Sequence, residues 1–151
     1  PRKANIIANG PVECYYLESQ DFYAMLGEFV EKFNKAHEER IIRAAKAFSK
    51  LSEYRIRVIM SNKDKLRYHR MFCGQRLVCG VGDIFVVIDG QFSSSQGETF
   101  SSEENSDIGS LDRTADEVAG ALTAISDEGL LVSISKEQLL EQIQLGRLRV
   151  I

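Results

Sequence analysis

The chain has 151 residues, of which 44% are hydrophobic and 27% are charged, and its formal net charge at pH 7 is -3. This composition is typical of an ordinary globular protein and argues against a disordered or fibrous chain. The length matches the commonest domain size, so we expect one domain over residues 1–151.

Membrane and export signals are missing from the residue pattern. No stretch approaches the roughly 18 consecutive apolar residues that a membrane span needs, and the N-terminus leads into no long apolar segment. The three cysteines, Cys14, Cys73 and Cys79, are an odd number without CxxC spacing, which favours reduced thiols over a disulfide framework or a zinc cluster. We therefore expect a cytoplasmic protein with no membrane partner.

The charge is distributed unevenly along the chain. Residues 32–76 hold thirteen basic and four acidic side chains, a net charge of +9, whereas residues 77–151 hold four basic and thirteen acidic ones, a net charge of -9. Such asymmetry marks either a surface for an anionic partner or two regions that neutralise each other in the fold.

Two elements are predicted before residue 52. Apolar runs at 6–8 and 14–17, separated by Asn9-Gly10-Pro11, indicate a β-hairpin. Ser19 can then cap a helix that begins near Gln20, because apolar residues recur at three- and four-residue steps from Phe22 to Leu51. We expect a break in this long helix near Asn34.

Period-two alternation over residues 54–60 predicts a half-buried strand. Residues 66–73, 77–81 and 84–88 follow as further strands, separated by short polar or glycine-containing turns. The sequence thus predicts an antiparallel meander of four strands, the last of which is apolar enough to be central.

The remaining third combines a polar segment with short helices. A Ser-rich and acidic stretch at about 92–112 is expected to be a mobile loop, because it offers few groups that could anchor a core. Thr114 and Glu117 have the capping-box spacing of a helix start, a strand is expected at 130–133, and Ser135 can cap a helix through Gln144 before a final strand at 148–151. The predicted fold class is therefore α+β: an antiparallel β-meander packed against one long amphipathic helix, with two shorter helices in the C-terminal third.

Signatures of catalysis are absent from the sequence. Gly80-Val81-Gly82-Asp83 is typical of a hairpin turn rather than a phosphate loop, the two histidines have no partner at ligand spacing, and no GxSxG motif is present. We expect no metal and no cofactor, and we favour a non-enzymatic protein, although an enzyme with a site assembled from distant residues stays open.

The basic region offers one candidate site. Arginines near aromatic residues suit neutralisation of a phosphate backbone combined with base stacking. The candidate nucleic-acid-binding residues are Arg43, Lys46, Lys50, Arg55, Arg57 and Arg67. A sequence pI of about 5.5 argues against a dedicated nucleic-acid binder.

The leading interpretation is a small binding or regulatory protein that acts through protein-protein contacts. Self-assembly, with a homodimer as its simplest form, is one version of it, because the apolar stripe of the long helix exceeds what a small sheet covers. Nucleic-acid binding by residues 32–76 is the first alternative, and an enzyme is the second.

Overall fold

The computed structural model describes residues 5–62, 64–104 and 106–147, and it divides the chain into two compact units, Pro1–Asn34 and Lys35–Ile151. In the first unit, residues 5–18 form no strand, so the predicted N-terminal hairpin is wrong. Helix α1 (Ser19–Ala44) starts at the predicted place and contributes its last turns to the second unit.

Helix α1 ends earlier than the sequence predicts. The regular helix continues past Asn34 and stops at Ala44, where Ala45 turns to an extended conformation with φ -65° and ψ 131°. A short 3-10 helix, η1 (Lys46–Phe48), follows. The apolar periodicity runs through this break because Ile41, Ile42 and Phe48 are all buried in one core.

The predicted strand at 54–60 is wrong, because these residues form helix α2 (Glu53–Ser61). Ser52 caps this helix by accepting a hydrogen bond from the Arg55 backbone N–H at 3.4 Å. Ile56 and Ile59 are buried at a three-residue spacing, which fits a helix face. Seven residues are too few for the apolar pattern alone to distinguish the two-residue period of a strand from the 3.6-residue period of a helix. The cap at Ser52 indicates the helix.

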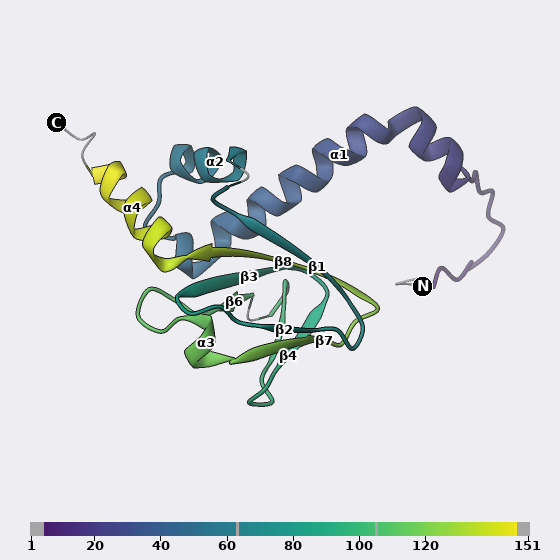
Figure 1. Ribbon diagram of the computed structural model, residues 1–151. Coiled ribbons are helices and arrows are strands. Elements are labelled where there is room, and N and C mark those ends of the chain that lie inside the picture. The colour runs from purple at the N-terminus through teal and green to yellow at the C-terminus, as the bar shows by residue number, and fades with distance from the viewer. Residues whose placement is uncertain (1–4, 63, 105, 148–151) are drawn as a thin grey trace. The chain divides into compact units, whose positions relative to one another are not determined.

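In the second unit, the described residues form two four-stranded antiparallel sheets (Figure 1). The strand order of the first sheet is β1-β8-β3-β6, and that of the second is β2-β7-β4-β5. The strands are β1 (Arg67–Phe72), β2 (Arg76–Val78), β3 (Asp83–Asp89), β4 (Gln91–Ser94), β5 (Thr99–Ser101), β6 (Asp107–Ile108), β7 (Ala121–Ala124) and β8 (Glu128–Ser135).

The predicted fold class, a meander against one helix, is therefore wrong. Strands β1, β2 and β3 do form near the predicted places, but none of them pairs with the next one along the chain. Instead β8 inserts between β1 and β3, with Tyr68 and Val86 both opposite Val132, while β2 joins the other sheet by pairing with β7. Short turns favour hairpins locally, but the pairing of residues about 60 positions apart is determined by burial on both faces of β8.

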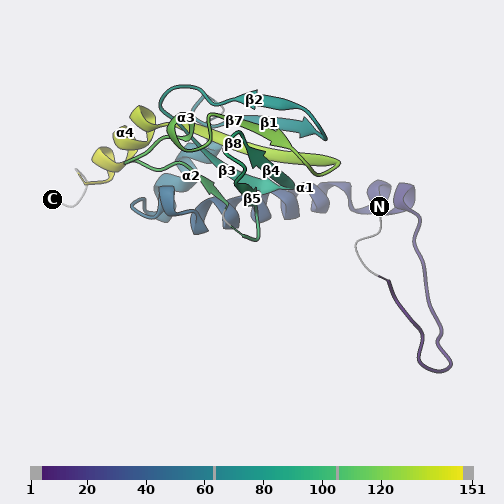
Figure 2. The same ribbon diagram turned by 90° about the horizontal axis from the view of Figure 1, so that it is seen from below.

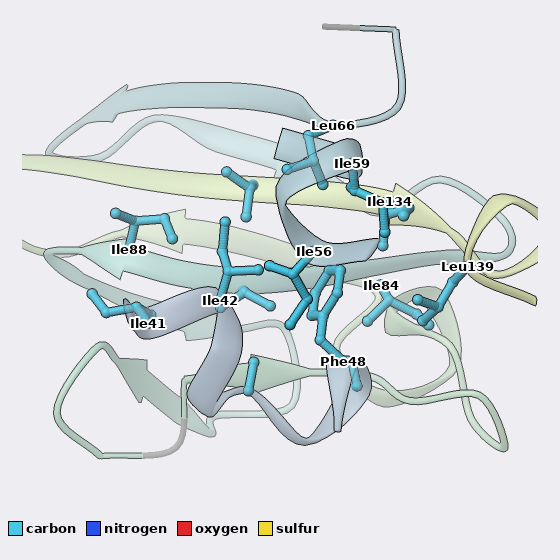
Figure 3. Packing of buried hydrophobic residues seen from close by; sticks show 14 of the residues in the cluster. Ile41, Ile42, Phe48, Ile56, Ile59, Leu66, Ile84, Ile88, Ile134 and Leu139 are labelled. Carbon is cyan, nitrogen blue, oxygen red and sulfur yellow. The ribbon is translucent and has the colours of Figure 1, made fainter. Parts of the chain in front are cut away.

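Two hydrophobic cores lie on opposite faces of the first sheet. One face packs against α1, η1, α2 and α4 (Lys136–Arg147) through residues such as Ile84, Ile134 and Leu139 (Figure 3). The other face packs against the second sheet through Phe85 and Leu131. The view in Figure 2 shows the strands from below. Because β3 is covered on both faces, its sequence is a continuous apolar run. Its predicted central position is confirmed, since it lies between β8 and β6 in the first sheet.

The Ser-rich segment at 92–112 contains strands β4, β5 and β6. Its few apolar residues anchor it strongly, because Phe92, Phe100 and Ile108 are exposed by no more than 2%. The mobility of the polar residues between these anchors stays a prediction.

The C-terminal helices agree with the sequence in part. The capping box at Thr114 is confirmed, with the Thr114 N–H donating to Glu117 Oε2 at 3.0 Å, but α3 (Ala115–Val118) is a single turn followed by β7. Ser135 precedes α4 as predicted, while the predicted strand at 148–151 lies outside the described residues. Among the described residues, no helix is long and apolar enough to cross a membrane.

Candidate functional site: the groove between α1 and α2

Two of the six predicted basic residues meet on a single carboxylate. Glu39 accepts hydrogen bonds from Arg43, four residues later on α1, and from Arg57 Nε on α2 at 3.3 Å. Arg43 also donates to Glu53 at 3.1 Å. The hydrogen bond from Arg57, joined by that from Arg43, lowers the pKa of Glu39. These ion pairs link the last turns of α1 to α2.

The other predicted residues lie elsewhere. Arg55 donates to the backbone carbonyl of Leu145 on α4 at 2.9 Å, and Arg67 donates to Asp83 on β3 at 2.5 Å. Lys46 and Lys50 are exposed near η1. The structure thus does not gather the six residues on one face, and it neutralises Arg43, Arg57 and Arg67 with carboxylates.

Three open hollows follow one another along α2 and the last turns of α1. Their volumes are about 570, 170 and 260 Å³. The first is lined by α2 and Asn62, the third by α1, and the second by both helices. The first and second share Arg57 and Ser61, and the second and third share Glu39, and we call the surface of these three neighbouring hollows the helical groove. Its lining residues are Lys35, Ala36, Glu39, Arg40, Arg43, Tyr54, Arg57, Val58, Met60, Ser61 and Asn62.

The helical groove combines positive charge with apolar surface. Among the lining residues that the structure describes, four are basic and Glu39 is acidic, which gives these residues a net charge of +3. Tyr54 is 57% exposed and supplies an aromatic edge beside Val58. A mixture of aromatic, aliphatic and arginine side chains that are at least partly exposed is the composition that protein interfaces favour.

A second polar cluster lies on the inner face of the first sheet. His69 Nε2 is 2.9 Å from Ser133 Oγ, and the His69 ring stacks at a tilt on Phe85 with 5.4 Å between ring centroids. Burial, assisted by the charge of Arg67 and opposed by that of Asp83, lowers the pKa of His69. His69 is thereby favoured in its neutral form, as a hydrogen-bonding side chain rather than a cation.

Close to this cluster, the turn before β3 is tied to α3. Asp116 Oδ1 accepts from the Gly82 N–H at 3.2 Å, and the hydrogen bond from Thr114, followed by that from Gly82, lowers the pKa of Asp116. Burial, together with the charges of Asp116 and Asp83, raises the pKa of Cys79 to about 11. Cys79 is therefore a protonated core thiol at neutral pH, without the thiolate character of a nucleophile.

The interior between the two sheets is filled by the chain's own side chains. Phe85, Phe92, Phe100, Leu122 and Leu131 are each exposed by 2% or less. Among the described residues, no group of three or more His, Cys, Asp or Glu side chains is placed to hold a metal ion. The three hollows of the helical groove lie outside this interior, on α1 and α2.

Sequence reasoning missed Glu39 and Ser133. The spacing of Glu39 and Arg43 by four residues on a predicted helix could have indicated their ion pair. No local signal connects Ser133 with His69, because 64 residues separate them and only the β1-β8 pairing brings them together.

No protein-family model matches the chain, and no curated protein matches it. Solved structures do match. The architecture of two antiparallel sheets with flanking helices is a β-sandwich that these structures share, which corrects the predicted meander.

Three solved structures illustrate this fold. A regulatory subunit of a cAMP-independent protein kinase A from Trypanosoma cruzi, bound to guanosine, is 12% identical with a TM-score of 0.56, covering 78% of this chain and 43% of its own. The sensor domain of the transcriptional regulator DNR from Pseudomonas aeruginosa is 13% identical with a TM-score of 0.54, covering 77% and 82%. A cyclic nucleotide-binding-like protein from Brucella abortus is 12% identical with a TM-score of 0.52, covering 71% and 97%.

These similarities establish the fold of the chain. This chain spans less than half the length of the Trypanosoma cruzi subunit. At 12–13% identity, a shared fold carries no activity from one protein to another.

Proposed function

We propose that the chain is a non-enzymatic regulatory domain that acts through protein-protein contacts at the helical groove. The observation that carries this proposal is the groove itself, where basic side chains of α1 and α2 and the exposed Tyr54 ring lie near the partly buried Val58 and Met60. The similarity of the fold to a kinase regulatory subunit and to a sensor domain supports a regulatory role.

The packing of the second unit supports the choice of the groove over the sandwich. Phe92 and Phe100 occupy the space between the sheets, so a ligand there would have to displace buried aromatic rings. A protein docking on the groove meets side chains that are exposed or partly exposed, and it need not unfold any part of the core.

Site-specific photo-crosslinking in cells tests the proposal. A photoreactive phenylalanine derivative replaces Tyr54, which lines the groove and is 57% exposed. Phe72 on β1, 51% exposed and outside the groove, is the matched control position. We expect a crosslinked polypeptide from position 54 that is lost when Lys35 and Arg40 are both changed to Glu. Crosslinking from position 72 alone would contradict the proposal.

A small-molecule ligand is a second candidate, which the polar cluster of Arg67, His69, Asp83 and Ser133 favours. Guanosine and a cyclic nucleotide are the compounds to test, because the Trypanosoma cruzi subunit is bound to guanosine and the Brucella abortus protein is described as cyclic nucleotide-binding-like. Calorimetric titration of the folded chain with each compound provides the test. Binding that His69→Gln weakens would support this candidate, and the absence of heat from both compounds would count against it.

Nucleic-acid binding through Arg43, Lys46, Lys50, Arg55, Arg57 and Arg67 remains a third proposal. The exposure of Lys46 and Lys50 supports it, while the carboxylate partners of Arg43, Arg57 and Arg67 reduce the charge available to phosphates. A salt-dependent shift of labelled RNA or DNA would support it.

A further inference from the structure

The N-terminal part of α1, residues 19–34, carries an uncovered apolar stripe. Phe22, Leu26, Phe29 and Phe33 follow one another at steps of four, three and four residues, which places them on one helix face. Their exposed fractions are 38%, 37%, 54% and 73%. An exposed stripe of this kind needs a covering surface, since soluble proteins rarely leave contiguous apolar patches in water.

The same segment is acidic where the helical groove is basic. Residues 19–34 contain Asp21, Glu28, Glu31 and Lys32, a net charge of -2, against the +3 of the groove lining. Asp21 and Glu28 are seven residues apart, so both lie along one flank of the apolar stripe. Lys32 lies over the Phe29 ring, 5.5 Å from its centroid, and it is eleven residues from Asp21 at the N-terminal end of this flank.

The groove presents matching features. Lys35 and Arg40 are exposed at its α1 side, and Tyr54, Val58 and Met60 provide apolar and aromatic surface at its α2 side. An amphipathic helix that lays its apolar face into a groove between helices is an established mode of recognition. The acidic flank would then face the basic side of the groove.

We propose that residues 19–34 of one copy of the chain dock in the helical groove of a second copy. The proposal rests on the proposed function, because it names the occupant of the same groove. Each copy carries both the acidic segment and the groove, so reciprocal docking produces a closed twofold dimer with two identical contacts. Opposite charges on the two surfaces also make the association sensitive to salt.

Paired charge reversals test this arrangement by sedimentation equilibrium of the full chain. The groove variant carries Lys35→Glu and Arg40→Glu, and the segment variant carries Asp21→Lys and Glu28→Lys. We expect the wild-type chain to dimerise more tightly at low salt, and each variant alone to weaken dimerisation by at least about tenfold. An equimolar mixture of the two variants should restore a heterodimer, because both of its contacts again join opposite charges.

The matched control is Lys46→Glu with Lys50→Glu, which changes the net charge as much as the groove variant does, at exposed positions outside the groove lining. It should dimerise like the wild type. Circular dichroism verifies that each variant is folded, and Lys35→Gln with Arg40→Gln repeats the test if a reversal unfolds the chain.

A monomeric wild-type chain at high concentration would overturn the inference, as would variants that dimerise unchanged or a mixture that stays monomeric. If position 54 then still crosslinks to a different protein, the proposed function stands and the occupant is that protein. If position 54 crosslinks to nothing and the chain is a monomer, both proposals fail.

Discussion

Phe92 provides the sharpest test of the sandwich, because the sequence placed it in a mobile loop and the structure buries it completely. Phe92→Ala should destabilise the chain by about 3–5 kcal/mol, the usual cost of deleting a buried phenylalanine ring. The upper part of this range applies, because Gly129 lies against the ring: a Cβ built on it would be 2.5 Å from Phe92 Cζ. Gly129 therefore has no side chain that could move into the cavity.

The size of the loss makes it easy to measure. Domains of this length are stable by about 5–15 kcal/mol, so the substitution removes a large share of the total. At roughly 2–4 °C per kcal/mol, the melting temperature should fall by about 6–20 °C. Urea denaturation should give a lower midpoint with an unchanged slope.

Phe72→Ala is the matched control, because it deletes the same ring from a position on β1 that is 51% exposed. It should cost less than half as much free energy of unfolding as Phe92→Ala. If both substitutions lower the free energy of unfolding by the same small amount, the packing of β4 between the sheets is refuted. Residues 92–112 would then be a loop, as the sequence predicted.

Three further predictions address pH, mobility and charge. The lowered pKa of His69 means that the unfolded chain binds a proton more readily, so stability is fully present above about pH 6.5 and declines as the pH falls below it; His69→Gln should flatten that decline in urea titrations between pH 7 and pH 5.5. Limited proteolysis should cut first within residues 93–107, and an uncut segment would contradict the predicted mobility. Arg55→Glu with Arg57→Glu should lower the melting temperature, since it breaks the contacts to Leu145 and Glu39, and unchanged stability with reduced nucleic-acid affinity would instead favour the phosphate-binding alternative.

Local signals predicted those elements whose ends are determined by nearby residues. Helix α1 starts at the predicted place, and the capping box at Thr114 and the start of α4 after Ser135 depend on side chains within a turn of the helix. The uninterrupted apolar run of β3 predicted a central strand because burial on both faces leaves no alternation.

Pairing between distant residues could not be predicted in the same way. The turns at Gly74 and Gly82 fit hairpins, yet β8 separates β1 from β3, and nothing near these strands identifies their partner. The error at residues 54–60 has a different origin, because a short run with buried Ile56 and Ile59 is compatible with a strand or a helix until Ser52 is recognised as a cap.

The sequence predicted some residues of the candidate site but not their arrangement. Arg43 and Arg57 were singled out for their charge, and both line the helical groove, but the sequence could not show that Glu39 holds them together. The apolar side of the groove was lost with the wrong assignment of α2, since Tyr54 and Val58 were placed in a strand. A groove between helices is a property of packing, and it becomes visible only in three dimensions.

Cysteine labelling in cells tests most directly whether the groove is a docking surface. Ser61→Cys lies in the groove and Gln96→Cys lies at an exposed turn, each in a background where Cys14 and Cys73 are changed to Ser. We expect a maleimide to label position 61 several-fold more slowly in cells than in the dilute purified protein, while position 96 reacts equally in both. Equal labelling of position 61 in cells and in dilute solution would contradict a protein partner at the helical groove.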